Sequence, residues 1–171
     1  MTTLTLVMLA GLPGTGKSTL ALALTRELGW PIIDKDIINT VTLTKLTSQA
    51  DAGRLAYEVA FALAEDAIMR QRLSVILDSA GRQSFILERC ADISRRADAR
   101  LKVIWCGAPG QVRAARLADR MPLPSQWATD QATDDDQIVW YAHLPADTLR
   151  LQSETTPDAM TTQALAFLQH S

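Results

Sequence analysis

Cysteines are scarce in this sequence, and their scarcity excludes two ways of stabilising a small protein. The 171 residues include two of them, Cys90 and Cys106, which have neither metal-ligand spacing nor the density of a disulfide scaffold. Neither a cysteine metal site nor a disulfide-stapled fold is therefore expected. Both cysteines fall in segments that read as helix and buried strand, so we expect reduced thiols in the core.

Long apolar runs and an excess of charge of one sign are also missing. No stretch reaches the length of a membrane span, and the amino terminus lacks the basic region of a secretory signal. We therefore expect a cytoplasmic protein with no membrane partner. The formal net charge is −2, which gives no electrostatic reason for tight binding to nucleic acid.

Length and composition indicate one ordinary folded domain. The chain is long enough for one complete α/β domain, residues 1–171, and too short for two of typical size. Hydrophobic residues make up 47% and charged residues 21%, as in a soluble globular protein. Basic residues are concentrated at positions 82–120, where an anionic ligand would be attracted, and aspartates follow at 130–147. The sequence leaves open whether the protein is a monomer or a homodimer.

The strongest signal is a glycine-rich motif at residues 11–19. Its sequence, GLPGTGKST, matches the phosphate-binding pattern G-x-x-x-x-G-K-[ST]. The apolar residues 4–10 before it have strand length, and leucines at positions 20, 24 and 28 recur at helical spacing. Strand, glycine loop and helix form the context in which this pattern binds ATP or GTP with Mg²⁺. The chain contains no Asn-Lys-x-Asp element for guanine, which favours ATP.

Each loop position has a physical role in holding a nucleotide. Glycines let the backbone turn tightly, so that successive N–H groups and the start of the following helix point at anionic oxygens. Lys17 should reach the β- and γ-phosphates as a mobile charge. Ser18 should place its hydroxyl on Mg²⁺, and Thr19 can donate to a more distal phosphate. The predicted nucleotide-binding residues are Gly11, Pro13, Gly14, Thr15, Gly16, Lys17, Ser18 and Thr19.

Strand-like and helix-like segments alternate along the rest of the chain. Strands are predicted at residues 31–34, 74–77, 101–106 and 148–152, with helices at 51–72, 83–97, 111–120, 135–142 and from 156. In the helix at 51–72, we expect Leu55, Val59 and Leu63 to form the apolar stripe. Alternating strands and helices imply a parallel sheet covered on both faces.

Polar side chains fall at the carboxyl ends of the first three strands. The first strand ends in the glycine loop, the second in Asp34, Lys35 and Asp36, and the third in Asp78 and Ser79. Ligands bind at this edge of open α/β sheets. The arrangement predicts one cleft assembled from three loops.

These residues, with the Arg-Leu-Ala-Asp-Arg segment at 116–120 that leads into a loop, resemble those of the P-loop kinase group. The group includes polynucleotide kinase, chloramphenicol phosphotransferase, gluconate kinase, the zeta toxins and many bacterial AAA-type ATP-binding proteins with no assigned substrate. The resemblance implies a three-layer P-loop NTPase fold, with a five-stranded parallel sheet in the order 2-3-1-4-5, helices on both faces and a short lid at about residues 117–132. It also implies transfer of the γ-phosphoryl group of Mg·ATP to a hydroxyl of a small molecule.

Within this resemblance, Asp36 is the candidate that orients and deprotonates the acceptor hydroxyl. Two alternatives stay open: Asp36 caps the following helix, or Asp34 is the base, and both aspartates are candidates for binding the acceptor. The polynucleotide kinase pattern has an arginine three residues after this aspartate, where this chain has Asn39. That difference argues against a nucleic-acid 5′ end as the acceptor. Lys35 is expected to be solvated.

Asp78 and two arginines complete the candidate site. Asp78 stands where a Walker B carboxylate would serve Mg²⁺, and members of the resembling group often use this position to bind the acceptor instead. Arg116 and Arg120 share one helix face, and the resemblance makes them lid arginines that stabilise the transferring group. Arg113 is a weaker third candidate. The alternative is an exposed basic face paired with Asp119.

Two functions remain open from the sequence alone. The first is an ATP-dependent kinase, and the second is a nucleotide-binding regulatory module or NTPase without a dedicated acceptor. A cleft lined by Asp36, Asp78 and lid residues that stays open beside the γ-phosphate would favour the kinase. Small or aliphatic residues in the flanking loops favour a compact, only partly charged acceptor; they are Ile37, Ile38, Val41, Leu43 and Ala80.

Overall fold

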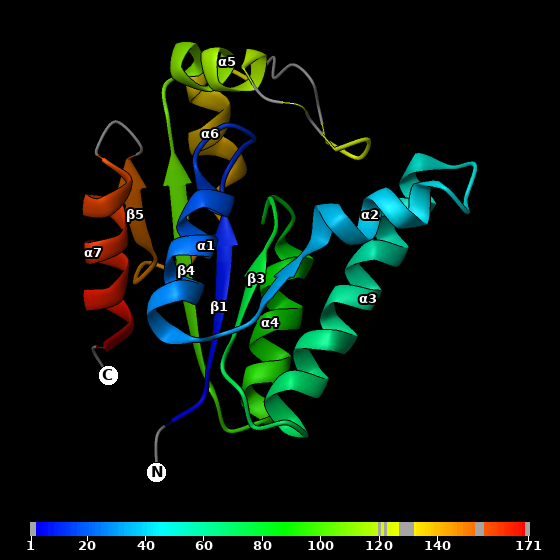
Figure 1. Cartoon of the computed structure of the whole chain (residues 1–171), viewed down its shortest axis with the longest axis vertical. Helices are drawn as coiled ribbons and strands as arrows, with labels where there is room; N and C mark the ends of the chain where they lie inside the picture. The colour runs from blue at the N-terminus through cyan, green and yellow to red at the C-terminus, as the bar shows by residue number, and fades with distance from the viewer. Residues whose placement is uncertain (1–2, 120, 122, 127–131, 153–155, 170–171) are drawn as a thin grey trace.

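The computed structural model describes residues 3–119, 121, 123–126, 132–152 and 156–169. At its centre is one sheet of five parallel strands in the order β2-β3-β1-β4-β5 (Figure 1). The strands are β1 (Thr5–Ala10), β2 (Ile32–Asp34), β3 (Val75–Asp78), β4 (Arg100–Gly107) and β5 (Leu149–Gln152). The sheet order expected from the sequence is confirmed.

Helices cover both faces of this sheet. They are α1 (Lys17–Leu28), α2 (Lys35–Leu43), α3 (Gln49–Met69), α4 (Ser84–Arg96), α5 (Gly110–Ala118), α6 (Asp134–Trp140) and α7 (Pro157–Gln169). Helices α3 and α4 pack on one face, and α1 and α7 pack on the other (Figure 1). The three-layer arrangement is therefore confirmed. Within the described ranges, no helix is both long and apolar enough to cross a membrane.

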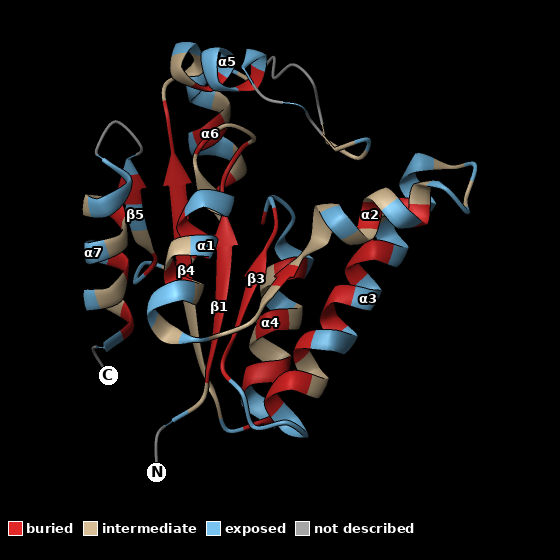
Figure 2. Cartoon of the chain, viewed as in Figure 1, coloured by how far each residue is buried: buried red, intermediate tan, exposed pale blue. Residues whose placement is uncertain are grey.

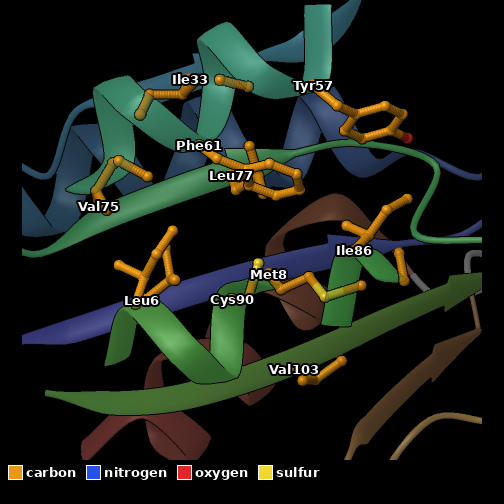
Figure 3. Packing of buried hydrophobic residues seen from close by; sticks show 14 of the residues in the cluster. Leu6, Met8, Ile33, Tyr57, Phe61, Val75, Leu77, Ile86, Cys90 and Val103 are labelled. Atoms are coloured by element: carbon orange, nitrogen blue, oxygen red, sulfur yellow. The ribbon is translucent and has the colours of Figure 1, made fainter. Parts of the chain in front are cut away.

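The sheet divides the core into two clusters, because successive side chains of a strand point to opposite faces. In β1, Leu6 and Met8 join the cluster with α3 and α4, whereas Val7 and Leu9 join the cluster with α1 and α7. Figure 3 shows Leu6 and Met8 beside Cys90 of α4. Every residue of β1 is buried (Figure 2), as expected for a parallel strand with helices on both sides.

The two cysteines are part of this core. Cys90 lies in the cluster with α3 and α4, and Cys106 lies in the other. Both are buried and free of a disulfide. Burial raises the pKa of each thiol to about 12, so neither is a reactive thiolate near neutral pH.

Helix α3 buries a different face from the one that the sequence indicated. Leu55, Val59 and Leu63 are all partly exposed, so the prediction that they form the core-facing stripe is wrong. The buried face carries Phe61, Ile68 and a set of alanines: Ala52, Ala56, Ala60, Ala64 and Ala67. Small side chains let α3 lie close to the sheet and to α2, and the larger Phe61 fills the remaining space.

Candidate active site

The phosphate loop links β1 to α1 at the carboxyl edge of the sheet (Figure 1). Gly11 has a φ of 140°, and a Cβ added there would lie 2.2 Å from the carbonyl oxygen of Cys106. Gly14 has a φ of 80°, and its Cβ would lie 2.9 Å from the carbonyl oxygen of Arg113. Because a side chain at either position would collide with backbone atoms, both positions require glycine. The loop is therefore shaped by the main chain that surrounds it.

Side chains close the loop from within. The Thr15 hydroxyl donates to the carbonyl oxygen of Leu12 at 2.8 Å, and Nζ of Lys17 donates to the same oxygen at 2.9 Å. Helix α1 begins at Lys17 after Gly16, which has no side chain to cap the first N–H groups, so these can serve an anion. Two of the predicted nucleotide-binding residues, Gly11 and Thr15, are buried. The other predicted nucleotide-binding residues line the cleft described below, namely Pro13, Gly14, Gly16, Lys17, Ser18 and Thr19.

Asp78, the last residue of β3, lies next to Ser18 of α1. Asp78 is 5% exposed, and burial raises the pKa of its carboxyl to about 6, although the charge of Lys17 and a hydrogen bond from Ser18 both lower it. A hydroxyl beside a carboxylate supplies the oxygen ligands that Mg²⁺ prefers, so these residues fit the ion. Among the residues that the structure describes, no group of three or more His, Cys, Asp or Glu could hold a metal. The ion would therefore also need the phosphate oxygens.

The two aspartates after β2 have different surroundings. The Asp34 carboxylate accepts hydrogen bonds from the backbone N–H groups of Asp36 at 2.8 Å and Ile37 at 3.4 Å, so Asp34 is the N-cap of α2. Asp36 instead lines the cleft. Its Oδ1 lies 3.3 Å from Nζ of Lys35, and its Oδ2 lies 3.1 Å from Nε2 of Gln126. The interpretation of Asp36 as the helix cap is wrong, and a role for Asp34 as base or acceptor ligand stays a prediction.

Lys35 is less solvated than the sequence suggested. Its side chain is 15% exposed, and Nζ lies 5.2 Å from the centroid of the Tyr57 ring. Lys35 also lines the cleft. It therefore brings positive charge to the candidate base, Asp36.

Helix α5, which precedes the predicted lid, carries two arginines in different surroundings. Nη1 of Arg116 donates to the carbonyl oxygen of Gly14 at 3.1 Å, so this guanidinium contacts the phosphate loop and lines the cleft. Arg113 is instead 1% exposed and lies 3.3 Å from the carboxylate of Asp134 in α6. The structure thus places Arg113 in the packing between α5 and α6. Arg120 lies outside the described residues, and its role stays a prediction.

Two residues of the predicted lid segment contact Asp36. The Ser125 hydroxyl donates to the backbone carbonyl of Asp36 at 2.8 Å, and Gln126 donates to its carboxylate. Ser125 also shares a hydrogen bond of 3.0 Å with Thr40 of α2. Neither residue was predicted, because isolated polar residues in an irregular segment carry no periodic signal.

These side chains meet in one open cleft of about 1000 Å³. Asp36 and Asp78 line it together with Lys17, Ser125 and Gln126, so free space remains beside the phosphate loop. Its far side comes from the loop after β3, which the sequence indicated, and from the first turns of α3 and α4, which it did not. The residues there include Arg54, Tyr57, Glu58, Ser79, Arg82 and Phe85.

The aliphatic residues expected around the acceptor mostly lie elsewhere. Of the five, Ala80 alone lines the cleft. Ile37 and Val41 are exposed, and Ile38 packs against the core cluster of α3 and α4. Four of these five residues therefore do not line the cleft, and a compact, only partly charged acceptor stays a prediction.

A smaller cavity of about 170 Å³ also adjoins the phosphate loop. It is lined by Gly16, Thr19 and Arg116, and by Pro157 and Met160 of α7. The cavity is thus a candidate site for the nucleoside part of the donor.

The fold and the loop together define the class of protein. A five-stranded parallel sheet with a phosphate loop after its central strand is that of a nucleotide-binding P-loop protein. The chain belongs to the AAA domain family, whose model matches residues 6–144. No curated protein sequence matches the chain.

Solved structures of kinases share this fold. A proposed kinase from Chloroflexus aurantiacus J-10-fl is similar with a TM-score of 0.74 and 23% identity, over 98% of this chain and 100% of that chain. A sugar kinase from Janibacter sp. HTCC2649 has a TM-score of 0.66 and 19% identity, over 98% and 95%. The APS kinase CysC of Mycobacterium tuberculosis, in complex with AMPPNP and APS, has a TM-score of 0.64 and 14% identity, over 99% and 100%. At these identities the likeness shows the fold, and with the family match it confirms the resemblance to P-loop kinases.

Proposed function

We propose that the protein is an ATP-dependent phosphotransferase that moves the γ-phosphoryl group of Mg·ATP to a hydroxyl of a small molecule. The observation that carries this proposal is the open cleft of about 1000 Å³ in which Asp36 and Asp78 face the same space as Lys17. The cleft is lined by the phosphate loop and also by residues of α2, α3 and α4, so it offers room for a second substrate beside the phosphates of the donor. The similar fold of three kinases supports the class of reaction.

The donor binds on the phosphate loop. Backbone N–H groups of residues 11–19 and the ammonium of Lys17 hold the β- and γ-phosphates. Ser18 and Asp78 hold Mg²⁺, which when bound neutralises charge on these phosphates. A cation beside Asp78 favours the ionised carboxylate and so opposes the effect of burial on its pKa. The smaller cavity beside α7 receives the nucleoside.

The acceptor binds on the opposite side of the cleft, where Asp36 takes the proton of its hydroxyl group. The hydroxyl oxygen bonds to the γ-phosphorus while the bond from this phosphorus to the bridging oxygen of ADP breaks, so that ADP and a phosphorylated acceptor form. Lys35 and Gln126 each donate to one carboxylate oxygen of Asp36 and fix its orientation. Arg116, and Arg120 in the lid, stabilise charge on the transferring group.

Asn39 supports a small acceptor rather than a nucleic-acid end. It is buried, and the Thr42 hydroxyl donates to its backbone carbonyl at 3.0 Å and reaches its side-chain oxygen at 3.4 Å. Asn39 does not line the cleft. The position at which the polynucleotide kinase pattern grips an anionic substrate is therefore used here for packing.

The proposal also includes the domain organisation, the cellular location and the partners of the protein. Residues 1–171 form a single domain with a lid at about residues 117–132, and the protein acts in the cytoplasm on ATP and a small acceptor, with no membrane or nucleic-acid partner. Light scattering coupled to size-exclusion chromatography decides between the monomer and the homodimer.

Transfer of phosphate from γ-labelled ATP tests this function. Sugars, nucleosides and antibiotics are incubated with the protein, Mg²⁺ and labelled ATP, and the products are separated by chromatography. We expect a labelled product from at least one acceptor, and none when the Lys17→Ala variant is used. ATP hydrolysis without transfer to any acceptor would instead favour the regulatory module or simple NTPase.

A further inference from the structure

The far side of the cleft carries an aromatic wall. The rings of Tyr57 in α3 and Phe85 in α4 lie edge to face, with centroids 5.4 Å apart and an interplanar angle of 83°. Phe61 contacts both rings, and Figure 3 shows it next to Tyr57 along α3. Phe85 is 40% exposed although two rings hold it, and it lines the cleft together with Tyr57. A fixed aromatic face of this kind favours contact with a planar ring.

A buried hydroxyl group stands beside this wall. Ser79, which follows Asp78, is 4% exposed and lines the cleft. Within the described residues its Oγ makes no hydrogen bond of normal geometry. Burial raises the pKa of the Tyr57 hydroxyl, and hydrogen bonding by the adjacent Ser79 hydroxyl opposes this shift. The hydroxyls of Ser79 and Tyr57 thus form a polar edge of the aromatic wall, which suits a polar atom of a ligand in the cleft.

Charged residues of both signs stand around the same wall. The cations that line this part of the cleft are Lys35, Arg54 and Arg82, and the anions are Asp36, Glu58 and Asp78. Arg54 pairs with an exposed aspartate of its own helix. The guanidinium of Arg82 lies over the ring of Trp140 in α6, with its Cζ 3.8 Å from the ring centroid. A stacked guanidinium keeps its N–H groups in a fixed plane, which suits a carboxylate or phosphate group.

We infer that this part of the cleft is the acceptor subsite, and that the acceptor is a hydroxyl compound with a planar ring and an anionic group. The ring lies against Phe85 and Tyr57, a polar atom of the ring bonds to Ser79, and the anionic group pairs with Arg82. The acceptor hydroxyl then faces Asp36. The inference rests on the proposed phosphotransferase function and adds the chemical class of its acceptor.

Four probes that share one sugar separate the ring from the charge. Adenosine 5′-monophosphate carries both features, adenosine carries the ring alone, ribose 5-phosphate carries the charge alone at the same position, and ribose carries neither. Transfer from γ-labelled ATP is measured for each at saturating Mg·ATP, so that competition for the donor site is suppressed. We expect kcat/KM to fall at least about tenfold when either feature is removed.

Two variants assign the effects to residues. Phe85→Leu keeps an apolar side chain and should lower kcat/KM about tenfold for the two adenosine compounds but not for ribose 5-phosphate. Arg82→Gln should lower kcat/KM about tenfold for the two phosphorylated compounds but not for adenosine. Arg95→Gln, in the exposed pair with Asp92 at the other end of α4, is the matched control and should change none of these values. AMPPNP binding and thermal melting show that each variant is folded.

The outcomes distinguish failure of the inference from failure of the function. If ribose or ribose 5-phosphate is the best of the four acceptors, or if Phe85→Leu affects all four alike, the acceptor subsite is not one for a planar ring, and the phosphotransferase stands. If a wider screen finds another acceptor, the inference holds only when that compound has a ring and an anion and responds to both variants. If no hydroxyl compound is labelled, the function itself fails.

Discussion

The two halves of the cleft are built in different ways. The donor half is one continuous segment, residues 11–19, whose shape is held by main-chain contacts at Gly11 and Gly14. The proposed acceptor half is made of side chains from α2, α3, the segment between β3 and α4, α4 itself and residues 125–126. A side chain there can change without moving the main chain that carries it. Under the proposed function, the same fold could therefore keep one phosphate donor while its acceptor varies.

The largest effect should come from the donor half. Lys17→Ala removes the ammonium that reaches the phosphates, so phosphoryl transfer should fall about a thousandfold, with a clear loss of AMPPNP affinity. Labelled-ATP assays and calorimetry measure the two effects. Lys45→Ala, in the exposed turn after α2, should change neither. If Lys17→Ala still transfers phosphate normally, the donor is not bound on this loop.

Asp36→Asn should impair phosphoryl transfer without weakening the binding of the nucleotide. Loss of the base should lower transfer about a hundredfold or more, while AMPPNP affinity stays within about twofold because Asp36 lies outside the loop. Asp34→Asn is the matched control, since asparagine can still cap α2. Normal transfer by Asp36→Asn would end its assignment as the base, and a large loss in Asp34→Asn would move that role to Asp34.

Asp78 lies between the two halves and should give the nucleotide-free protein a pH-dependent stability. Its pKa is about 6 in the folded protein against 3.8 as the ordinary value, so folding favours the protonated form. The resulting stabilisation is fully present below about pH 4 and is lost as the pH rises through about 6, with a difference of up to about 3 kcal/mol. The excess unfolding free energy of wild type over Asp78→Asn should therefore fall across this range in urea titrations. A constant difference would show that burial does not shift this carboxyl.

The smallest effect is expected at the contact between the lid and the base. Gln126→Ala removes one donor from the Asp36 carboxylate, and kcat should fall about three- to tenfold with an unchanged KM for ATP. Gln71→Ala, which removes a similar bond to an exposed aspartate at the end of α3, should leave kcat unchanged. An unaltered kcat in Gln126→Ala would mean that Lys35 alone orients the base.

The donor half could be predicted from the sequence because its signal is local. A contiguous motif, a strand before it and a helix after it specify the loop, and the resemblance to P-loop kinases supplied the sheet order. The acceptor half depends on which way each helix faces. Leu55 was a poor guide to the orientation of α3, because close packing selected its alanines instead. Arg113 and Arg116 differ by less than one helical turn, yet one is buried and the other contacts the loop.

The roles of two neighbouring aspartates could not be predicted from the sequence either. Asp34 and Asp36 are both suitable N-cap residues, two positions apart, and the extended backbone of Asp34 decides which of them caps α2. The side chain that is left over, Asp36, is the one that lines the cleft. The sequence indicates that either aspartate can cap the helix, but only the position at which α2 begins determines which one does so and which one lines the cleft.

The close approach of Gly14 to α5 has a mechanical consequence. The gap between the loop and the main chain of Arg113 is too small for one methyl group, so the two main-chain segments are in direct contact. A shift of the loop at this point must displace α5 by a similar amount. Since Arg116 is carried on α5 and donates to the Gly14 carbonyl, this guanidinium keeps its position relative to the phosphate loop when the loop moves.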